Sequence, residues 1–236
     1  MSIFAIGDIH GHLVALDALL ANIPAGPDDT VVFLGDYVDK GPEVRGTLDR
    51  LYALHKTRGY VFLRGNHDQI MIDAHHKSSK MTIWESLGGE ETLMSYGSGL
   101  TEDVMKYIPD QHWEFLEKIC RNYYQTDEYI FVHGGIRPRV SPKKEKPERL
   151  LWTTLNHAAP HKSGKTVICG HSAQRSGRIA DLGHTICIDT GIGKGSLLTC
   201  LELDTFRFWQ ANPLGRLHIG RLERDDSSAK EASATS

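Results

Sequence analysis

The sequence predicts an α/β fold, and two observations carry this prediction. Five short runs of apolar and β-branched residues are each followed closely by glycine next to Asp, Asn or His; they cover residues 3–6, 31–34, 60–63, 129–132 and 166–169. Runs of this length and composition suit buried strands. Apolar residues at helical spacing separate the first three runs, and strands that alternate with helices are typical of βαβ units.

The other elements follow from the spacing of apolar residues along the chain. Apolar residues from 13 to 23 predict a first helix, and those from 44 to 55 predict a second one, with Pro42 well placed near its start. Residues 81–124 have a helical pattern without strands, and we interpret them as a helical insertion. Three late runs are expected to form antiparallel strands that complete the sheet: residues 184–188, 197–203 and 206–209.

Length and composition favour one globular domain. The chain has 236 residues, of which 40% are hydrophobic and 24% charged, and its formal net charge is −3. These ordinary values argue against a nucleic-acid or membrane partner. The expected domain covers residues 1–224, and residues 225–236, which lack large apolar side chains, are expected to be disordered. With no apolar run of membrane length and no leader-like start, the cytoplasm is the expected location.

The polar residues at the strand ends form a set of metal-ligand types. In α/β folds such residues gather beyond the carboxyl ends of the strands. Three imidazoles, two carboxylates and an amide, without a thiolate, suit Mn, Fe, Zn or Co. Six ligands exceed the three of a catalytic zinc and fit two ions that share a carboxylate. A lone Asp or His would be read as a cap or a structural residue. The candidates are Asp8, His10, Asp36, Asn66, His133 and His171.

Five motifs resemble those of the calcineurin-like metallophosphoesterases: residues 7–11 (GDIHG), 35–41 (GDYVDKG), 65–68 (GNHD), 133–135 (HGG) and 170–171 (GH). Within that family the chain looks most like PPP-type serine/threonine protein phosphatases in their small bacterial and phage form. The resemblance covers about residues 2–210, and residues 188–191 (IDTG) also match how small bacterial members end. It implies two packed mixed β-sheets flanked by helices, with the site at the sheet edge.

The resemblance also implies a dinuclear metal centre, bridged by the carboxylate of Asp36. Manganese is the expected metal, with iron, zinc and cobalt as alternatives. The two ions would lower the pKa of a shared water, and the resulting hydroxide would attack phosphorus in line without a phosphoenzyme. By motif position, one ion would be held by Asp8, His10 and Asp36, and the other by Asp36, Asn66, His133 and His171.

Two further residues match the acid dyad of the family. His67 would protonate the leaving oxygen, and Asp39 would orient and stabilise its imidazolium. Lys40 and Arg64 are the candidate contacts of the substrate phosphate. The family usually has arginine in place of Lys40 and another arginine near the position of Thr154. Because lysine cannot form the planar fork of arginine, these departures predict a weak phosphatase or one with an altered substrate.

The predicted function is therefore metal-dependent hydrolysis of phosphomonoesters, above all phosphoserine and phosphothreonine in proteins. The substrate would be a phosphoprotein or a small phosphoester. A symmetrical bis(5′-nucleosyl)-tetraphosphatase shares the motifs and is the nearest alternative, although Asp39 favours the phosphatase. A metal-binding interaction module with little catalysis is a second alternative. The sequence leaves open the oligomeric state and whether residues 81–124 shape substrate access or only pack.

Overall fold

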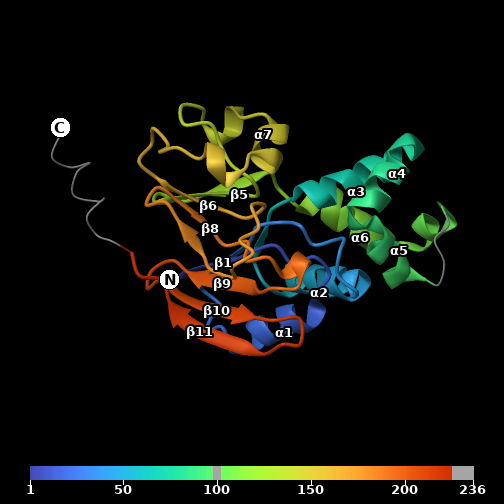
Figure 1. The fold of residues 1–236 in the computed structure, drawn as a ribbon, viewed down its shortest axis with the longest axis horizontal. Coiled ribbons are helices and arrows are strands. Elements are labelled where there is room, and N and C mark those ends of the chain that lie inside the picture. Colours follow the sequence, from blue (N-terminus) through green and yellow to red (C-terminus); the bar gives the residue numbers. More distant parts are fainter. Residues whose placement is uncertain (98–101, 225–236) are drawn as a thin grey trace.

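Two mixed β-sheets, packed face to face, form the centre of the protein (Figure 1). The computed structural model describes residues 1–97 and 102–224. The first sheet has the order β11 (Leu217–Arg221), β10 (Arg207–Ala211), β9 (Leu198–Glu202), β1 (Ile3–Ile6), β2 (Thr30–Phe33) and β3 (Val61–Phe62). The second has the order β4 (Tyr123–Gln125), β5 (Tyr129–Val132), β6 (Thr166–Cys169), β8 (Thr185–Cys187) and β7 (Ala180–Asp181).

The central strands are continuously apolar because both of their faces are buried. In and after β2, successive side chains point to opposite faces of the sheet. Val32 and Leu34 pack between the two sheets, against Ile168 of β6 among others. Val31 and Phe33 point the other way, into the cluster under the helices. The predicted architecture of two packed mixed sheets with flanking helices is thus confirmed.

Helices cover the outer faces of both sheets. In α2, Val44, Leu48 and Leu51 are buried at helical spacing and face the first sheet. The second sheet is covered on its outer side by a cluster that includes Leu150 of α7. The α-helices are α1 (Leu13–Asn22), α2 (Val44–Thr57), α3 (Asn66–His76), α4 (Met81–Trp84), α5 (Glu90–Tyr96), α6 (Asp110–Glu114) and α7 (Pro147–Trp152).

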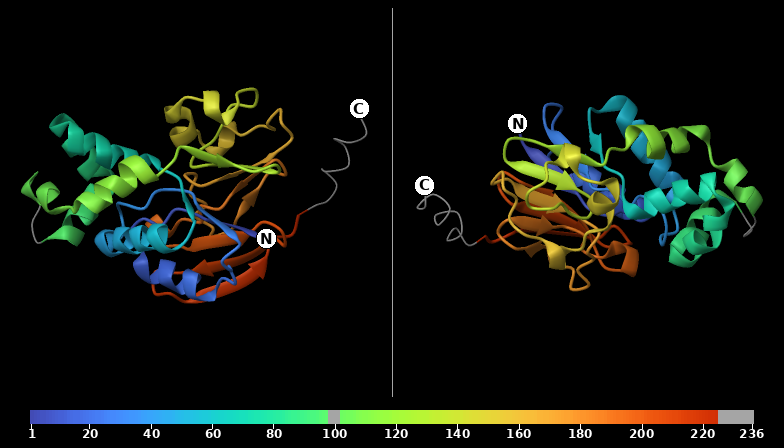
Figure 2. Two further views of the ribbon diagram at one scale, coloured as in Figure 1. Left: turned by 180° about the vertical axis from the view of Figure 1, so that it is seen from behind. Right: turned by 90° about the horizontal axis from the view of Figure 1, so that it is seen from above.

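Short helical turns of other types join these helices. From α4 to η4, helices lie to one side of the sandwich (Figure 2), and we call this part the helical segment. The turns are η1 (Ser78–Lys80), η2 (Glu85–Gly89), η3 (Glu102–Tyr107), η4 (Phe115–Ile119), η5 (Pro142–Lys144), η6 (Leu155–His157) and η7 (Ile192–Lys194).

Some elements differ from the predictions. The late strands β9 and β10 are antiparallel neighbours in the first sheet, as predicted, but β8 lies in the second sheet and pairs in parallel with β6. That prediction was wrong for β8, because an apolar run does not reveal which sheet it joins. The helical pattern also ends earlier than predicted, since β4 begins at Tyr123. The expected disordered tail, residues 225–236, lies outside the described residues, and the single domain over residues 1–224 stays a prediction.

The described helices are too short or too polar to cross a membrane.

Candidate metal centre and acid pair

Five of the six candidate ligands line one cavity of about 90 Å³, and the sixth, His133, contacts two of them, Asn66 and Asp36. Asp8, Asp36 and Asn66 follow the parallel strands β1, β2 and β3, while His133 and His171 follow β5 and β6. The residues that line the cavity are Asp8, His10, Asp36, Lys40, Asn66, His67, His171, Ala173, Asp189, Gly191, Gly193 and Lys194.

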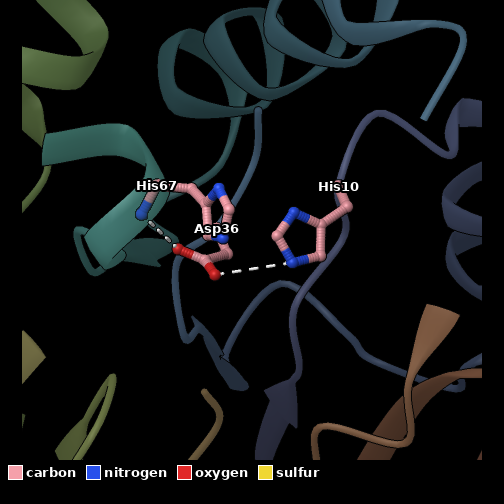
Figure 3. Close-up of side chains that lie close together, drawn as sticks. All are labelled: His10, Asp36 and His67. Atoms are coloured by element: carbon pink, nitrogen blue, oxygen red, sulfur yellow. Dashed lines mark hydrogen bonds and ion pairs between the residues drawn. The ribbon is translucent and has the colours of Figure 1, made fainter. Parts of the chain in front are cut away.

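Asp36 lies between two imidazoles, one at each carboxylate oxygen. Its Oδ2 is 3.5 Å from Nε2 of His10 (Figure 3), and its Oδ1 is 3.4 Å from Nε2 of His133. Nδ1 of His10 is 2.8 Å from the carbonyl oxygen of Val38. Because that oxygen can only accept, Nδ1 carries the proton, and the lone pair of Nε2 accepts a hydrogen bond from the ammonium of Lys40 at 3.0 Å, beside Oδ2 of Asp36. A carboxylate whose two oxygens face nitrogens of different imidazoles is well placed to bridge two metal ions.

Around His133, three lone pairs converge. Its Nδ1 is 2.9 Å from the carbonyl oxygen of Leu34, so Nδ1 carries a proton. In a neutral ring, Nε2 then points its lone pair at two acceptors, Oδ1 of Asn66 at 2.9 Å and Oδ1 of Asp36. Oδ1 of Asn66 is also 2.8 Å from Nδ1 of His171. Such a cluster of lone pairs is satisfied by a cation, and the donor set therefore fits a divalent metal.

The electrostatics of the cavity also suit a cation. Burial and the carboxylates of Asp189 and Asp36 raise the pKa of Asp8 well above its usual value. Burial and Asp36 likewise raise the pKa of Asp189. Burial opposes ionisation of Asp36 too, but the surrounding imidazoles outweigh it and lower its pKa. A divalent ion would relieve this mutual repulsion of buried carboxylates.

Burial favours the neutral form, which binds metals, in two of the candidate imidazoles, His10 and His171. Burial lowers the pKa of His10 well below its usual value. Burial and the neighbouring His133 lower the pKa of His171 to about 4. Ligand atoms of Asp8, Asp36 and His133 lie within 4.8 Å of one another, and the same holds for His10, Asp36 and His67.

Backbone strain is concentrated in this site. Six non-glycine residues in the described ranges have φ in the left-handed region, which costs roughly 1–2 kcal/mol per residue. Strain of this kind persists where surrounding contacts fix it, often at functional sites. Five of the six belong here: His10, Asp36, Asp39, Lys40 and His171.

Asp68 holds the loop after β2 in this shape. Its carboxylate accepts hydrogen bonds from the backbone N–H groups of Asp36 and Tyr37, both at 2.9 Å, and of Gly65 at 2.7 Å. Burial and the charge of Asp36 raise its pKa to about 7. This role of Asp68 was not predicted, because the spacing of the residue in the sequence does not distinguish a metal ligand from a carboxylate that binds backbone amides.

Asp39 and His67, the acid pair, are buried side by side. Nδ1 of His67 is 2.7 Å from Oδ2 of Asp39, which leaves Nε2 as the ring nitrogen that a substrate could reach. Burial disfavours the imidazolium, but Asp36 and Asp39 outweigh it and raise the pKa of His67. His67 is near enough to His10 and Asp36 to count as a ligand, yet its bond to Asp39 suits an acid better.

The two predicted phosphate contacts are placed differently. Lys40 lines the cavity, and its Nζ is 3.0 Å from Nε2 of His10. Arg64, in contrast, is outside the set of described residues that line the cavity. Its role as a phosphate anchor stays a prediction that the geometry does not favour. Its guanidinium donates to the carbonyl oxygens of Leu116 and Glu117 and to Oε1 of Gln69.

Comparison with known proteins gives the family. A model of the calcineurin-like phosphoesterases matches residues 1–190. The chain belongs to this family. It is 27% identical over 209 residues to serine/threonine-protein phosphatase 1 of Salmonella typhimurium, covering 85% of this chain and 91% of the relative. It is 26% identical over 233 residues to the asymmetrical bis(5′-nucleosyl)-tetraphosphatase PrpE of Oceanobacillus iheyensis, covering 88% and 91%.

The fold comparison agrees with the family. A solved structure of a protein proposed to be a diadenosine tetraphosphatase superposes with a TM-score of 0.61 at 19% sequence identity. The match covers 95% of each chain. The predicted resemblance to calcineurin-like phosphoesterases is confirmed at the level of family and fold.

In this calcineurin-like phosphoesterase, two charged residues that line the cavity, Asp189 and Lys194, were not predicted from the sequence. Asp189 follows β8, and its Oδ1 accepts a hydrogen bond from the backbone N–H of Gly191 at 3.0 Å. Its position at a strand end was the signal that could have found it. Lys194 ends η7 and is exposed. A Cβ on Gly193 would lie only 2.4 Å from Cδ2 of His10, so glycine there lets η7 approach the site.

Proposed function

We propose that the protein is a metal-dependent phosphomonoesterase that acts on phosphoserine and phosphothreonine in proteins. The acid pair, Asp39 and His67, is the observation that carries this proposal. The alkoxide of serine is a poor leaving group and needs a proton, whereas a nucleoside polyphosphate leaves readily without one. An acid pair buried beside a cavity with metal-ligand side chains is therefore suited to an alkyl phosphate ester. The similarity to a serine/threonine phosphatase supports the same substrate.

We assign the ligands as the sequence motifs imply. When bound, two divalent ions would acidify a water molecule and offset charge on the phosphate. Manganese is the proposed metal and the cytoplasm the proposed location. One ion would be held by Asp8, His10 and Asp36, and the other by Asp36, Asn66, His133 and His171.

The remaining roles belong to side chains at the same cavity. His67 donates the proton of Nε2 to the leaving oxygen. Asp39 accepts a hydrogen bond from Nδ1 of His67 and thereby keeps the ring in the orientation that this step needs. Lys40 and Lys194, which both line the cavity, supply positive charge to the phosphate. Because each is a single flexible point charge, the grip on phosphate is weaker than that of arginine pairs.

The experiment compares two substrates with different leaving groups after reconstitution with Mn²⁺. His67→Asn should lower kcat for a phosphoserine peptide by about 10²–10⁴-fold, the usual contribution of a general acid. The same change should affect p-nitrophenyl phosphate far less, because its leaving group needs little protonation. His218→Asn, at an exposed residue of β11, is the control. Equal losses with both substrates would contradict the acid role.

A tetraphosphatase is the second candidate, and the residues at the positions expected to bind phosphate favour it. Lys40 and Thr154 stand where arginines are expected, and Arg64 faces η4 instead of the cavity. The similarity to PrpE supports this candidate. Incubation with diadenosine tetraphosphate decides: two molecules of ADP indicate symmetrical cleavage, and ATP with AMP indicates asymmetrical cleavage. If diadenosine tetraphosphate were turned over much faster than the phosphopeptide, the tetraphosphatase would replace the phosphatase as the proposed function. Metal uptake without any hydrolysis would identify a binding module.

A further inference from the structure

The helical segment contacts the acid pair directly, through two buried side chains. Nε1 of Trp84, at the end of α4, donates to Oδ1 of Asp39 at 2.9 Å. Oγ1 of Thr92, in α5, donates to the same oxygen at 2.8 Å and accepts from the backbone N–H of Asp39 at 2.9 Å. The other oxygen, Oδ2, is left for His67. The relative exposures of Asp39, Trp84 and Thr92 are all 0%.

We propose that Trp84 and Thr92 are positioning residues for the acid pair, an inference that rests on the proposed function. Two donors at Oδ1 fix the plane of the Asp39 carboxylate, so that Oδ2 stays directed at Nδ1 of His67. Hydrogen bonds to an ionised acceptor are among the stronger ones in proteins, and here both donors are excluded from water. The helical segment thereby takes part in catalysis through Asp39.

Charge retention is the second effect of these donors. Burial raises the pKa of Asp39, and the hydrogen bonds from His67, Thr92 and Trp84 oppose that effect. Without the two donors from the helical segment, the carboxyl group would rotate or take up a proton. A neutral or rotated Asp39 would no longer hold the ring of His67 in the orientation that directs Nε2 to the leaving oxygen.

A kink at Gly88 brings both donors to Asp39. Trp84 and Thr92 lie on opposite sides of this kink, where Gly88 has φ +113°. The carbonyl oxygen of Gly88 accepts a hydrogen bond from the backbone N–H of Lys40 at 3.1 Å. The helical segment therefore binds two successive residues of the loop after β2. Contacts with side chains and backbone together make this a specific docking of the helical segment on the acid pair.

The experiment measures kcat with two leaving groups in conservative variants. Trp84→Phe removes one donor to Asp39, whereas Thr92→Val removes one donor together with the acceptor of the Asp39 backbone N–H; both keep most of the packed volume. Each should lower kcat for a phosphoserine peptide roughly tenfold, a fraction of what a general acid contributes, with little change for p-nitrophenyl phosphate. Metal content and KM should stay near those of the original protein. A merely structural role would lower kcat for both substrates alike, and that result would overturn the proposal.

Matched controls come from buried residues of the same types. Trp209→Phe changes a tryptophan that is 1% exposed and lies in β10, and Thr47→Val changes a fully buried threonine of α2. Both lie outside the contacts of Asp39 described above. We expect neither control to alter the ratio of kcat values for the two substrates. A shift of that ratio in the controls as large as in Trp84→Phe would overturn the proposal.

A double variant tests whether the residues act as a unit. Asp39→Asn combined with Trp84→Phe should be no slower on the phosphopeptide than Asp39→Asn alone, because the indole then has no carboxylate to position. If the two substitutions lowered kcat independently, so that their fold-losses multiplied, the result would contradict the proposal.

A spectroscopic measurement separates this inference from the proposed function. The proton on Nδ1 of His67, held by Asp39, should give a downfield signal in the proton NMR spectrum. Trp84→Phe should shift or broaden that signal, whereas Trp209→Phe should not. If the original protein hydrolysed no phosphopeptide, the proposed function would fail while this signal still decided the inference. An unchanged signal in Trp84→Phe would overturn it.

Discussion

At the residue scale, Asp36 is the centre of the candidate site. Each of its carboxylate oxygens faces a different imidazole, at 3.5 and 3.4 Å. Its Oδ1 also accepts a hydrogen bond from the backbone N–H of His67 at 3.0 Å (Figure 3). The backbone of Asp36 is itself held by Asp68. A residue with so many fixed contacts has little freedom to be replaced.

We expect Asp36→Asn to lose metal and activity together. The amide keeps the shape of the side chain but removes the negative charge that two cations would share. Metal analysis after reconstitution should find fewer than two ions per chain, and kcat/KM should fall by at least about a hundredfold. Asp17→Asn, in an exposed ion pair with Arg50, is the control and should change neither quantity. Full metal content in Asp36→Asn would rule out a bridging role.

Lys194 gives a second prediction at this scale. Since Lys194 is exposed and lines the cavity, Lys194→Ala should raise KM for a phosphomonoester several-fold and leave kcat nearly unchanged. Added salt should narrow the difference between the variant and the original protein, because salt screens exposed charges. Lys143→Ala, in η5, serves as the control. An unaltered KM in Lys194→Ala would remove Lys194 from the phosphate contacts.

At the element scale, the loop after β2 and the helical segment depend on each other. Gly88 has φ +113°, a backbone angle that residues with a Cβ rarely adopt. A Cβ there would also lie 2.9 Å from Cγ of Lys40 and 3.3 Å from Cβ of Asp39. The kink at Gly88 therefore has both a conformational and a steric requirement for glycine.

Gly88→Ala should destabilise the protein by about 1–2 kcal/mol, from the left-handed backbone alone. It should also displace Asp39 and lower kcat for a phosphoserine peptide. Urea unfolding and steady-state kinetics measure the two effects. Gly97→Ala is the matched control, because its φ of 177° suits any residue and its Cβ would meet nothing within 4 Å. Equal stability of the two variants would show that the kink is not strained.

The sequence predicted the elements that have a strong local pattern. The buried strands β1, β5 and β6 were predicted at their observed bounds because both faces of each strand are covered. The half-exposed β11 and the two-residue β7 were missed, since neither forms an apolar run.

For the candidate site, the pattern of polar residues at strand ends predicted that the six candidate ligands lie close together, because parallel strands end at one edge of a sheet. It could not reveal side-chain direction. Arg64 directly precedes the GNHD motif, yet it points to η4. It also could not reveal partners from distant helices, such as Trp84 and Thr92 at Asp39.

At the scale of the whole molecule, the buried side chain of His112 links the stability of the protein to pH. His112 in α6 is buried, with Nδ1 2.7 Å from the hydroxyl of Tyr96 and Nε2 3.0 Å from Asp49. Burial lowers the pKa of His112, although Asp49 acts against this effect. The unfolded chain, with an ordinary histidine pKa of about 6.5, takes up this proton more readily than the folded protein.

We therefore expect the free energy of unfolding to fall as the pH drops below about 6.5. The fall should continue until the pH reaches the lowered pKa of His112 in the folded protein. One such histidine contributes at most about 1.4 kcal/mol per pH unit. His112→Gln should be less stable than the original protein at pH 7.5 but lose less stability between pH 7 and pH 5. Urea unfolding of the metal-free protein at several pH values measures this, and an unchanged slope would contradict the assignment.

The candidate ligands are spread along the chain in an order that matters during synthesis. A nascent polypeptide made as far as β3 already contains Asp8, His10 and Asp36, whereas His171 follows only after β6. Under the proposed assignment of ligands, most of the chain must therefore emerge from the ribosome before a second ion could meet all of its ligands.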